Sequence, residues 1–302
     1  MRTSAEIILS ARRHGVAIPA FNIPYLPMVE PVIKAVADED AFAFVVVARP
    51  EWIKFESGSA AAVRDEFAKW DDPQHVRLHL DHVPVIDEDN LRVDYLPIIK
   101  DAIELGYQSV MVDGSRLDLA ENIACTKEVA DAAHEAGIAC EAELGAIVGH
   151  EEGPMPSYEE LFTSGKGFTD IAEARQFVEE TGTDWLSVAI GSVHGAISKA
   201  RKDEKKVEAR LDLDHLDKLV EATGIPLVLH GGSSIIQEYI LKAFERGIAK
   251  INVATEIRQP YERVLKETGT VAAAQTAVHE RTKWILRDYL RLAGISKTIL
   301  EK

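Results

Sequence analysis

The amino-acid sequence predicts an α/β fold, a (β/α)8 TIM barrel with an additional C-terminal helical segment. Short apolar or β-branched runs alternate with longer stretches of helical period, and eight such units follow one another along the 302 residues. Polar residues follow nearly every short run, and no GxGxxG motif follows the first, which favours the barrel over an open doubly wound sheet. Because no long Pro-, Ser- or Gly-rich linker divides the chain, residues 1–302 are expected to form one domain.

The individual elements follow from these runs in chain order. The expected strands are residues 17–22, 42–47, 76–81, 109–113, 139–144, 185–190, 227–230 and 250–253. Amphipathic helices are expected between them, among them residues 96–105, 120–136, 171–181, 213–223 and 235–246. Gly137 and Gly224 follow two of these helices and are suited to the left-handed conformation that ends a helix. The tail, about 260–302, is expected to be helical and to cap the barrel or pack on a partner subunit.

Composition excludes several classes of function. The 34 basic and 50 acidic residues give a formal charge of −16, which disfavours nucleic acid and anionic membranes as partners. The opening MRTSAEIILSARRHG has too short an apolar stretch for a secretory signal, and no later run reaches membrane-spanning length. Cys125 and Cys140 alone provide no disulfide framework and suit a reducing compartment. A cytoplasmic protein is expected.

Three histidines stand at the carboxyl ends of different expected strands. They are His82 in VRLHLDH, His194 in GSVHG and His230 in LVLHGG. In a barrel these ends converge on one rim, and three histidines with no fourth protein ligand describe a catalytic zinc site open to water or substrate. The alternatives are a turn or surface ion pair for the Asp81–His82 dipeptide, and ordinary loop chemistry for His194.

Asp81 and His82 are adjacent, and adjacent strand residues point to opposite faces of a sheet. Both are therefore expected to reach the site only if His82 lies just past the regular strand. His79 shares the parity of Asp81, and a hydrogen-bonded structural role inside the barrel is expected for it.

Carboxylates lie on the same rim. Asp113 follows VMV, and Glu141 and Glu143 share one face of the strand ACEAEL. They are expected to bind a second metal ion, to orient the histidines by hydrogen bonds, or to form interior ion pairs, and we favour orientation for Asp113 and Glu143. Glu151 in GAIVGHEEGP is either a base that covers the substrate or part of a solvated loop.

The segments HGGSS and INVAT follow the seventh and eighth expected strands. In these barrels, the two loops at this place and a helix N-terminus form the habitual phosphate site. Ser233, Asn252 and Thr255 offer further donors, or else cap the following helices. A phosphorylated small-molecule substrate is expected.

These segments together resemble the class II, zinc-dependent fructose-bisphosphate and tagatose-bisphosphate aldolase family. The resemblance runs from VAIPAFNI at 16–23 through LHLDH, SVMVDGS, CEAELG, VAIGSVHG and LVLHGGS to KINVATE. It implies a reversible aldolase that cleaves a ketose phosphate to dihydroxyacetone phosphate and an aldehyde, with Zn²⁺ or another divalent metal. A homodimer or homotetramer is also expected.

The resemblance implies a role for each matched residue. His82, His194 and His230 hold the zinc, and Asp113 and Glu143 match positions of an alternative or second metal ion. Asp81 handles the C4 hydroxyl proton, and Glu151 exchanges the proton α to the ketone. The residues that match the phosphate and monovalent-cation loops are Gly195, Gly231, Gly232, Ser233, Asn252, Ala254 and Thr255, and Asn22 is counted with the substrate-binding residues.

The sequence also departs from the family pattern. Ser234 replaces a glycine, and Ala254 replaces the Asn or Asp of the fructose-bisphosphate branch, as in the tagatose branch. Arg49 follows the second strand where relatives have small residues, and it is either a binder of carboxylate, sulfonate or phosphate or a solvated charge. An aldolase acting on a sulfonated or carboxylated ketose is therefore an alternative substrate assignment.

Two further alternatives differ in class. One is a zinc-dependent hydrolase on the same barrel, with Asp81 as the base, although the first strand lacks the HxH pair of such enzymes. The other is a non-catalytic barrel subunit, whose mark would be lost metal ligands, and none of the matched ligands is lost.

Overall fold

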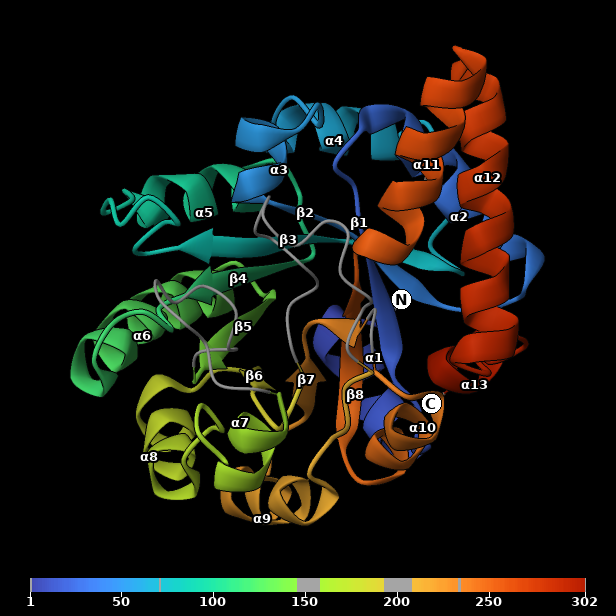
Figure 1. The fold of residues 1–302 in the computed structure, drawn as a ribbon. Coiled ribbons are helices and arrows are strands. Elements are labelled where there is room, and N and C mark those ends of the chain that lie inside the picture. The colour runs from blue at the N-terminus through green and yellow to red at the C-terminus, as the bar shows by residue number, and fades with distance from the viewer. Residues whose placement is uncertain (1, 71, 146–157, 193–207, 233–234, 302) are drawn as a thin grey trace.

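The computed structural model describes residues 2–70, 72–145, 158–192, 208–232 and 235–301. Parallel strands form a closed barrel in the order β1 to β8, and helices surround it (Figure 1). The strands are β1 (Ile18–Asn22), β2 (Ala43–Ala48), β3 (Val76–Pro84), β4 (Ser109–Asp113), β5 (Ala139–Leu144), β6 (Trp185–Val188), β7 (Leu227–Leu229) and β8 (Ile248–Val253). The predicted (β/α)8 barrel is confirmed.

Most strand boundaries agree with the sequence prediction, and the exceptions have local causes. β4 and β5 have the expected bounds, whereas β6 ends at Val188 and not at residue 190. The reason is that Ala189 exchanges hydrogen bonds with Thr169: the Thr169 amide donates to the Ala189 carbonyl, 2.9 Å, and the Thr169 hydroxyl accepts from the Ala189 amide, 2.8 Å. β3 is longer than expected and runs to Pro84.

The helices lie where the apolar period places them. Those before the C-terminal segment are α1 (Ser4–Arg13), α2 (Val29–Asp38), α3 (Arg49–Lys54), α4 (Ala60–Phe67), α5 (Tyr95–Glu104), α6 (Leu119–Glu135), α7 (Tyr158–Ser164), α8 (Ile171–Thr181), α9 (Leu213–Thr223) and α10 (Gln237–Glu245), with a 3-10 turn at Leu26–Met28. α8 and α9 have the predicted bounds. α9 ends at Gly224 with φ +68°, the left-handed conformation expected there. None of the helices in the described ranges combines the length and apolarity needed to cross a bilayer.

The C-terminal segment begins earlier than expected. α11 (Thr255–Thr268) follows β8 after the single residue Ala254, so Pro260 lies inside the helix and does not start it. α12 (Val271–Trp284), a π turn (Ile285–Tyr289) and α13 (Ser296–Leu300) complete the chain. α12 lies on the outside of the barrel beside α11 and α2 (Figure 1), where Gln275 donates to the carbonyl of Pro27, 2.9 Å. α11 and α12 thus line the flank of the barrel, and α13 packs on α1 at its amino-terminal end.

The amino-terminal end of the barrel interior is mainly apolar, with the buried guanidinium of Arg77 over the ring of Phe42. α1 contributes Ile7 and Ile8 to a buried cluster with Ile18, Phe44 and Val228 from the strands. The two chain ends meet at this end of the molecule, since the Arg2 guanidinium donates to the Ile299 carbonyl, 2.9 Å. This apolar plug closes the barrel below the polar residues, so that the carboxyl-terminal rim is left for chemistry.

Candidate active site

A β-bulge in β3 brings two adjacent side chains to the same rim. Leu80 pairs with Val110 of β4, but Val83 pairs with Val112, so β3 has one extra residue in this interval. His82 sits in the bulge with φ +23°, a value uncommon for a residue with a side chain. The expectation that His82 lies past the regular strand was wrong: β3 runs on to Pro84. The bulge, not the strand end, lets both Asp81 and His82 reach the site.

Asp81 is fully buried and held by two amides. The Asn22 Nδ2 donates to Oδ2 of Asp81 at 3.0 Å, and the Asn252 Nδ2 lies 3.0 Å from both carboxylate oxygens. Burial by itself raises the pKa of the Asp81 carboxyl, but the positive charges of His82 and Lys250 hold that pKa well below its usual range. The structure therefore presents Asp81 as an oriented carboxylate.

The imidazole of His82 faces two carboxylates. Its Nδ1 lies 3.1 Å from Oδ2 of Asp113 and 3.7 Å from Oε2 of Glu143. Ser115 fixes Asp113 in turn by donating its amide and hydroxyl to Oδ1. The contact through Nδ1 leaves Nε2 of His82 as the nitrogen that remains for another partner.

His230 directly follows β7, and its ring stands edge-on to His82 with centroids 4.5 Å apart. Its Nε2 lies 3.1 Å from Oε1 of Glu141, and its Nδ1 lies 3.0 Å from Oε2 of Glu143. Within the described residues, this Nδ1 and this Oε2 are buried and form no hydrogen bond of proper geometry. Two buried, unsatisfied ligand atoms that face one another suit a cation between them.

The side chains at the rim form two groups with metal-ligand spacing. Potential ligand atoms of Asp81, His82 and His230 lie within 4.8 Å of one another, and so do those of His82, Asp113 and Glu143. A third group, His79 with Asp81 and Glu141, lies deeper in the barrel. Two other residues predicted from the sequence, His194 and Glu151, lie outside the described residues.

The deeper layer contains a buried cation that the sequence analysis did not single out. Lys250 of β8 lies 2.8 Å from Oε2 of Glu141, and it donates to Oδ1 of Asn252 at 2.7 Å. The Trp185 indole donates to Glu141 as well, at 2.5 Å. His79 forms a hydrogen bond of the kind expected for it, with its Nδ1 2.9 Å from the Ser109 hydroxyl. The sequence did contain a signal for Lys250. It is a single charged residue in the apolar strand IAKINV, and it lies on the same face of that strand as Asn252.

The residues expected around a phosphate are described in part. Gly231 has φ +72°, and a Cβ at Gly232 would stand 2.8 Å from Cδ1 of Ile251, so both positions require glycine. Thr255 is the first residue of α11, and Ala254 before it provides no side-chain cap. Gly195 and Ser233, like the departure at Ser234, lie outside the described residues.

The segment after β2 places a basic and an acidic residue near the rim. Arg49 begins α3, is 21% exposed at its side chain, and lies 3.4 Å from Oδ2 of Asp87. Glu51, also missed by the sequence analysis, is buried and accepts the Ala48 amide at 2.8 Å. Burial, and to a lesser degree the charge of Asp81, raise the pKa of the Glu51 carboxyl to about 8.

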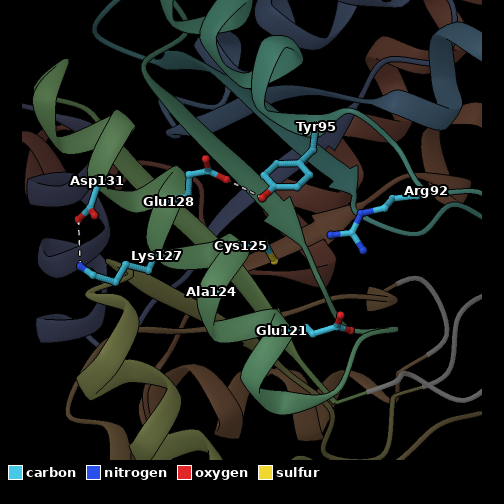
Figure 2. Close-up of a pocket in the computed structure, with 8 residues that line it drawn as sticks. All are labelled: Arg92, Tyr95, Glu121, Ala124, Cys125, Lys127, Glu128 and Asp131. Carbon is cyan, nitrogen blue, oxygen red and sulfur yellow. Dashed lines mark hydrogen bonds and ion pairs between the residues drawn. The ribbon is translucent and has the colours of Figure 1, made fainter.

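A surface hollow of about 560 Å³ lies elsewhere, over the outer side of α6 and the start of α5 (Figure 2). It is lined by charged side chains, and Tyr95 donates to Glu128 across it at 2.7 Å. Cys125 at its base has a pKa raised to about 11 by burial, which makes the thiol a poor nucleophile. This hollow shares no residue with the histidine site.

Comparisons with known proteins agree on one family. The family model for class-II fructose-bisphosphate aldolase matches residues 2–296. The YdjI aldolase from Escherichia coli K12 is similar in structure, with a TM-score of 0.76, 28% identity, and coverage of 97% of this chain and 98% of that chain. A candidate fructose-1,6-bisphosphate aldolase from Coccidioides immitis has the same TM-score and identity, with 98% of each chain covered.

A third structure supports the fold alone. The fructose-bisphosphate aldolase of Campylobacter jejuni is 18% identical, with a TM-score of 0.72 over 95% of this chain and 94% of that one. Taken with the family match over nearly the whole sequence, these likenesses lead to one conclusion. The chain belongs to the class-II fructose-bisphosphate aldolase family, whose members are metal-dependent aldolases.

Proposed function

We propose that this protein reversibly cleaves a ketose phosphate or bisphosphate to dihydroxyacetone phosphate and an aldehyde. The observation that carries the proposal is the convergence of Asp81, His82 and His230 from β3 and the end of β7 within 4.8 Å. A carboxylate held by two amides, beside two imidazoles, supplies a base next to a metal site.

The residues that would hold the metal are His82, His194 and His230, and we propose zinc. The unsatisfied Nδ1 of His230 and Oε2 of Glu143 support a cation at this place, with Asp113 and Glu143 serving an alternative or second position. When bound, a divalent metal ion stabilises the negative charge that develops on the oxygens of the enediolate after the carbon–carbon bond breaks.

Asp81 would accept the proton of the C4 hydroxyl during cleavage. Its charged state is favoured, and the amides of Asn22 and Asn252 fix the direction of its oxygens. A second group must then protonate the enediolate carbon, and we assign this step to Glu151 on the strength of the family resemblance.

The phosphate would bind where α11 begins. The N-terminus of this 14-residue helix favours an anion, and the close packing of Gly232 on Ile251 holds the segment after β7 against β8, which leads into that helix. We assign phosphate and monovalent-cation contacts to Gly195, Gly231, Gly232, Ser233, Asn252, Ala254 and Thr255, and a substrate contact to Asn22.

A second candidate is an aldolase for a sulfonated or carboxylated ketose, and Arg49 favours it. The guanidinium is partly exposed and has a long contact of 3.4 Å to Asp87, which a substrate anion could replace. The family match over residues 2–296 argues against the hydrolase alternative, because the members of the family are aldolases.

A cleavage screen tests the proposal. Fully metallated protein is offered ketose 1-phosphates, ketose 1,6-bisphosphates, and sulfonated or carboxylated ketoses, with and without chelator. We expect cleavage of one of these classes that chelator abolishes and added zinc restores. Failure to cleave every ketose, with hydrolysis of a simple ester or amide, would contradict it.

A further inference from the structure

We propose that Lys250 is a positioning residue that fixes both the metal ligand His230 and the base Asp81 from inside the barrel. The assignment of those two roles rests on the function proposed above. Lys250 lies in β8 and is fully buried. Its hydrogen bonds run to one neighbour of each of the two functional residues.

The first link leads to His230. The Lys250 ammonium lies 2.8 and 3.1 Å from the two carboxylate oxygens of Glu141. Oε1 of Glu141 lies 3.1 Å from Nε2 of His230, and a carboxylate only accepts, so the proton must be on Nε2. This tautomer leaves the lone pair of Nδ1, on the side of Glu143, for a metal.

The carboxylate of Glu141 is held in place by its neighbours. Lys250 contacts both of its oxygens, and the Trp185 indole donates to Oε2 at 2.5 Å. Oε1 is thereby turned toward Nε2 of His230. A neutral residue at position 250 would remove the contact that reaches both oxygens, and the direction in which the carboxylate faces His230 would no longer be fixed.

The second link leads to Asp81. The Lys250 ammonium donates to Oδ1 of Asn252 at 2.7 Å. Because an ammonium group cannot accept, the amide of Asn252 must present its oxygen to Lys250 and its Nδ2 to Asp81, at 3.0 Å from both oxygens. Without the ammonium, the amide could turn over and present an oxygen to the carboxylate.

A purely structural ion pair is the competing explanation, since a buried Lys–Glu pair also fills a barrel interior. Arg77 provides the matched control, because it is equally buried but lies at the amino-terminal start of β3, where it donates to the carbonyl of Pro73 at 2.6 Å. Lys250→Met and Arg77→Met both remove a buried cation, and Lys250 alone adjoins the site.

The test measures zinc affinity by chelator competition, the ¹⁵N signals of the histidines in metal-free protein, and turnover of each variant. Lys250→Met should weaken zinc binding by roughly 10–100-fold and shift the His230 tautomer. It should lower kcat and change KM much less. Arg77→Met should lower only the denaturant midpoint of unfolding. Zinc affinity, tautomer and kcat equal to those of the wild type would overturn the proposal.

Lys250→Met removes the cation beside Glu141 and is expected to destabilise the fold, so a second variant keeps the test decisive. The double variant Lys250→Met with Glu141→Gln removes both charges and keeps an oxygen that can accept from His230. We then expect near-wild-type zinc affinity with a reduced kcat, because Asn252 is no longer held. Wild-type kcat in this variant would overturn the link to Asp81. The zinc and tautomer measurements need no substrate, so they test Lys250 even if no ketose is cleaved.

Discussion

The two ends of the barrel interior are equally buried and differ in their chemistry. At the amino-terminal end, Ile8, Ile18 and Phe44 pack in an apolar cluster. Toward the carboxyl-terminal rim, Asp81 and Lys250 are as inaccessible to water as those residues. Burial therefore does not distinguish the functional layer. What distinguishes it is a cluster of charged side chains in mutual contact, whereas at the amino-terminal end the buried cation Arg77 lies over the Phe42 ring.

Stability and chemistry are associated with different ends of this barrel. Burying a charge is unfavourable unless partners compensate, and an apolar replacement of similar size is often neutral or stabilising. The carboxyl-terminal layer keeps Glu141, Lys250 and His79 nonetheless, linked by contacts of 2.8 to 3.5 Å. We infer that the apolar end carries the stability and that the charged end is retained for its chemistry.

The largest effect is expected at the charged end. His230→Ala removes an imidazole that faces the unsatisfied Oε2 of Glu143, and zinc affinity and ketose cleavage should fall together by roughly 100-fold or more. Zinc content and turnover are measured on the same sample. His134→Ala is the control, since His134 is 44% exposed at its side chain and bonds only to Asp184 within the contacts described. A His230→Ala protein with full zinc content would contradict the assignment of metal binding to the charged end of the barrel.

The apolar end should respond in the opposite way. Ile8→Ala leaves a cavity in the plug below the strands, and the free energy of unfolding should fall by about 2–5 kcal/mol while kcat of the folded enzyme is unchanged. Denaturant unfolding and turnover give the two readouts. Leu9→Ala next to it alters a side chain of a residue that is 46% exposed and should cost far less. A large loss of kcat in Ile8→Ala would show that the two ends are not separate.

An effect confined to one pH interval concerns Glu51, whose carboxyl has a pKa near 8 in the fold because of burial. This value exceeds the ordinary 4.5, so the neutral form contributes stability that is fully present below about pH 4.5 and is lost as the pH rises through about 8. Glu51→Gln should therefore gain in unfolding free energy relative to the wild type across this interval. Denaturant unfolding of metal-free protein at several pH values measures the gain. A difference that does not vary with pH would contradict the assignment.

Much of the barrel follows from sequence patterns. β2 is a continuous apolar run because it is covered on both faces, and helices such as α8 have a clear amphipathic period. The rim histidines His82 and His230 were found for the same reason, since polar residues after buried strands stand out. The start of α11 was missed because Pro260 looked like a boundary.

The parts that could not be predicted depend on pairing between strands. The bulge at His82 is a shift of β3 against β4, and an alternation pattern within one strand does not reveal it. Likewise, the contacts of Lys250 with Glu141 join residues 109 apart in sequence. The Asn252 side chain was predicted to donate to a phosphate, and in the structure its amide donates to Asp81.

The most direct test of the central account is turnover of Asp81→Ala, with bound zinc quantified in the same preparation. The account predicts that cleavage of the ketose falls by roughly 10²–10⁴-fold while zinc content stays at the wild-type level, because the carboxylate acts as the base beside the metal. Cleavage that persists, or that falls only in proportion to lost zinc, would contradict it.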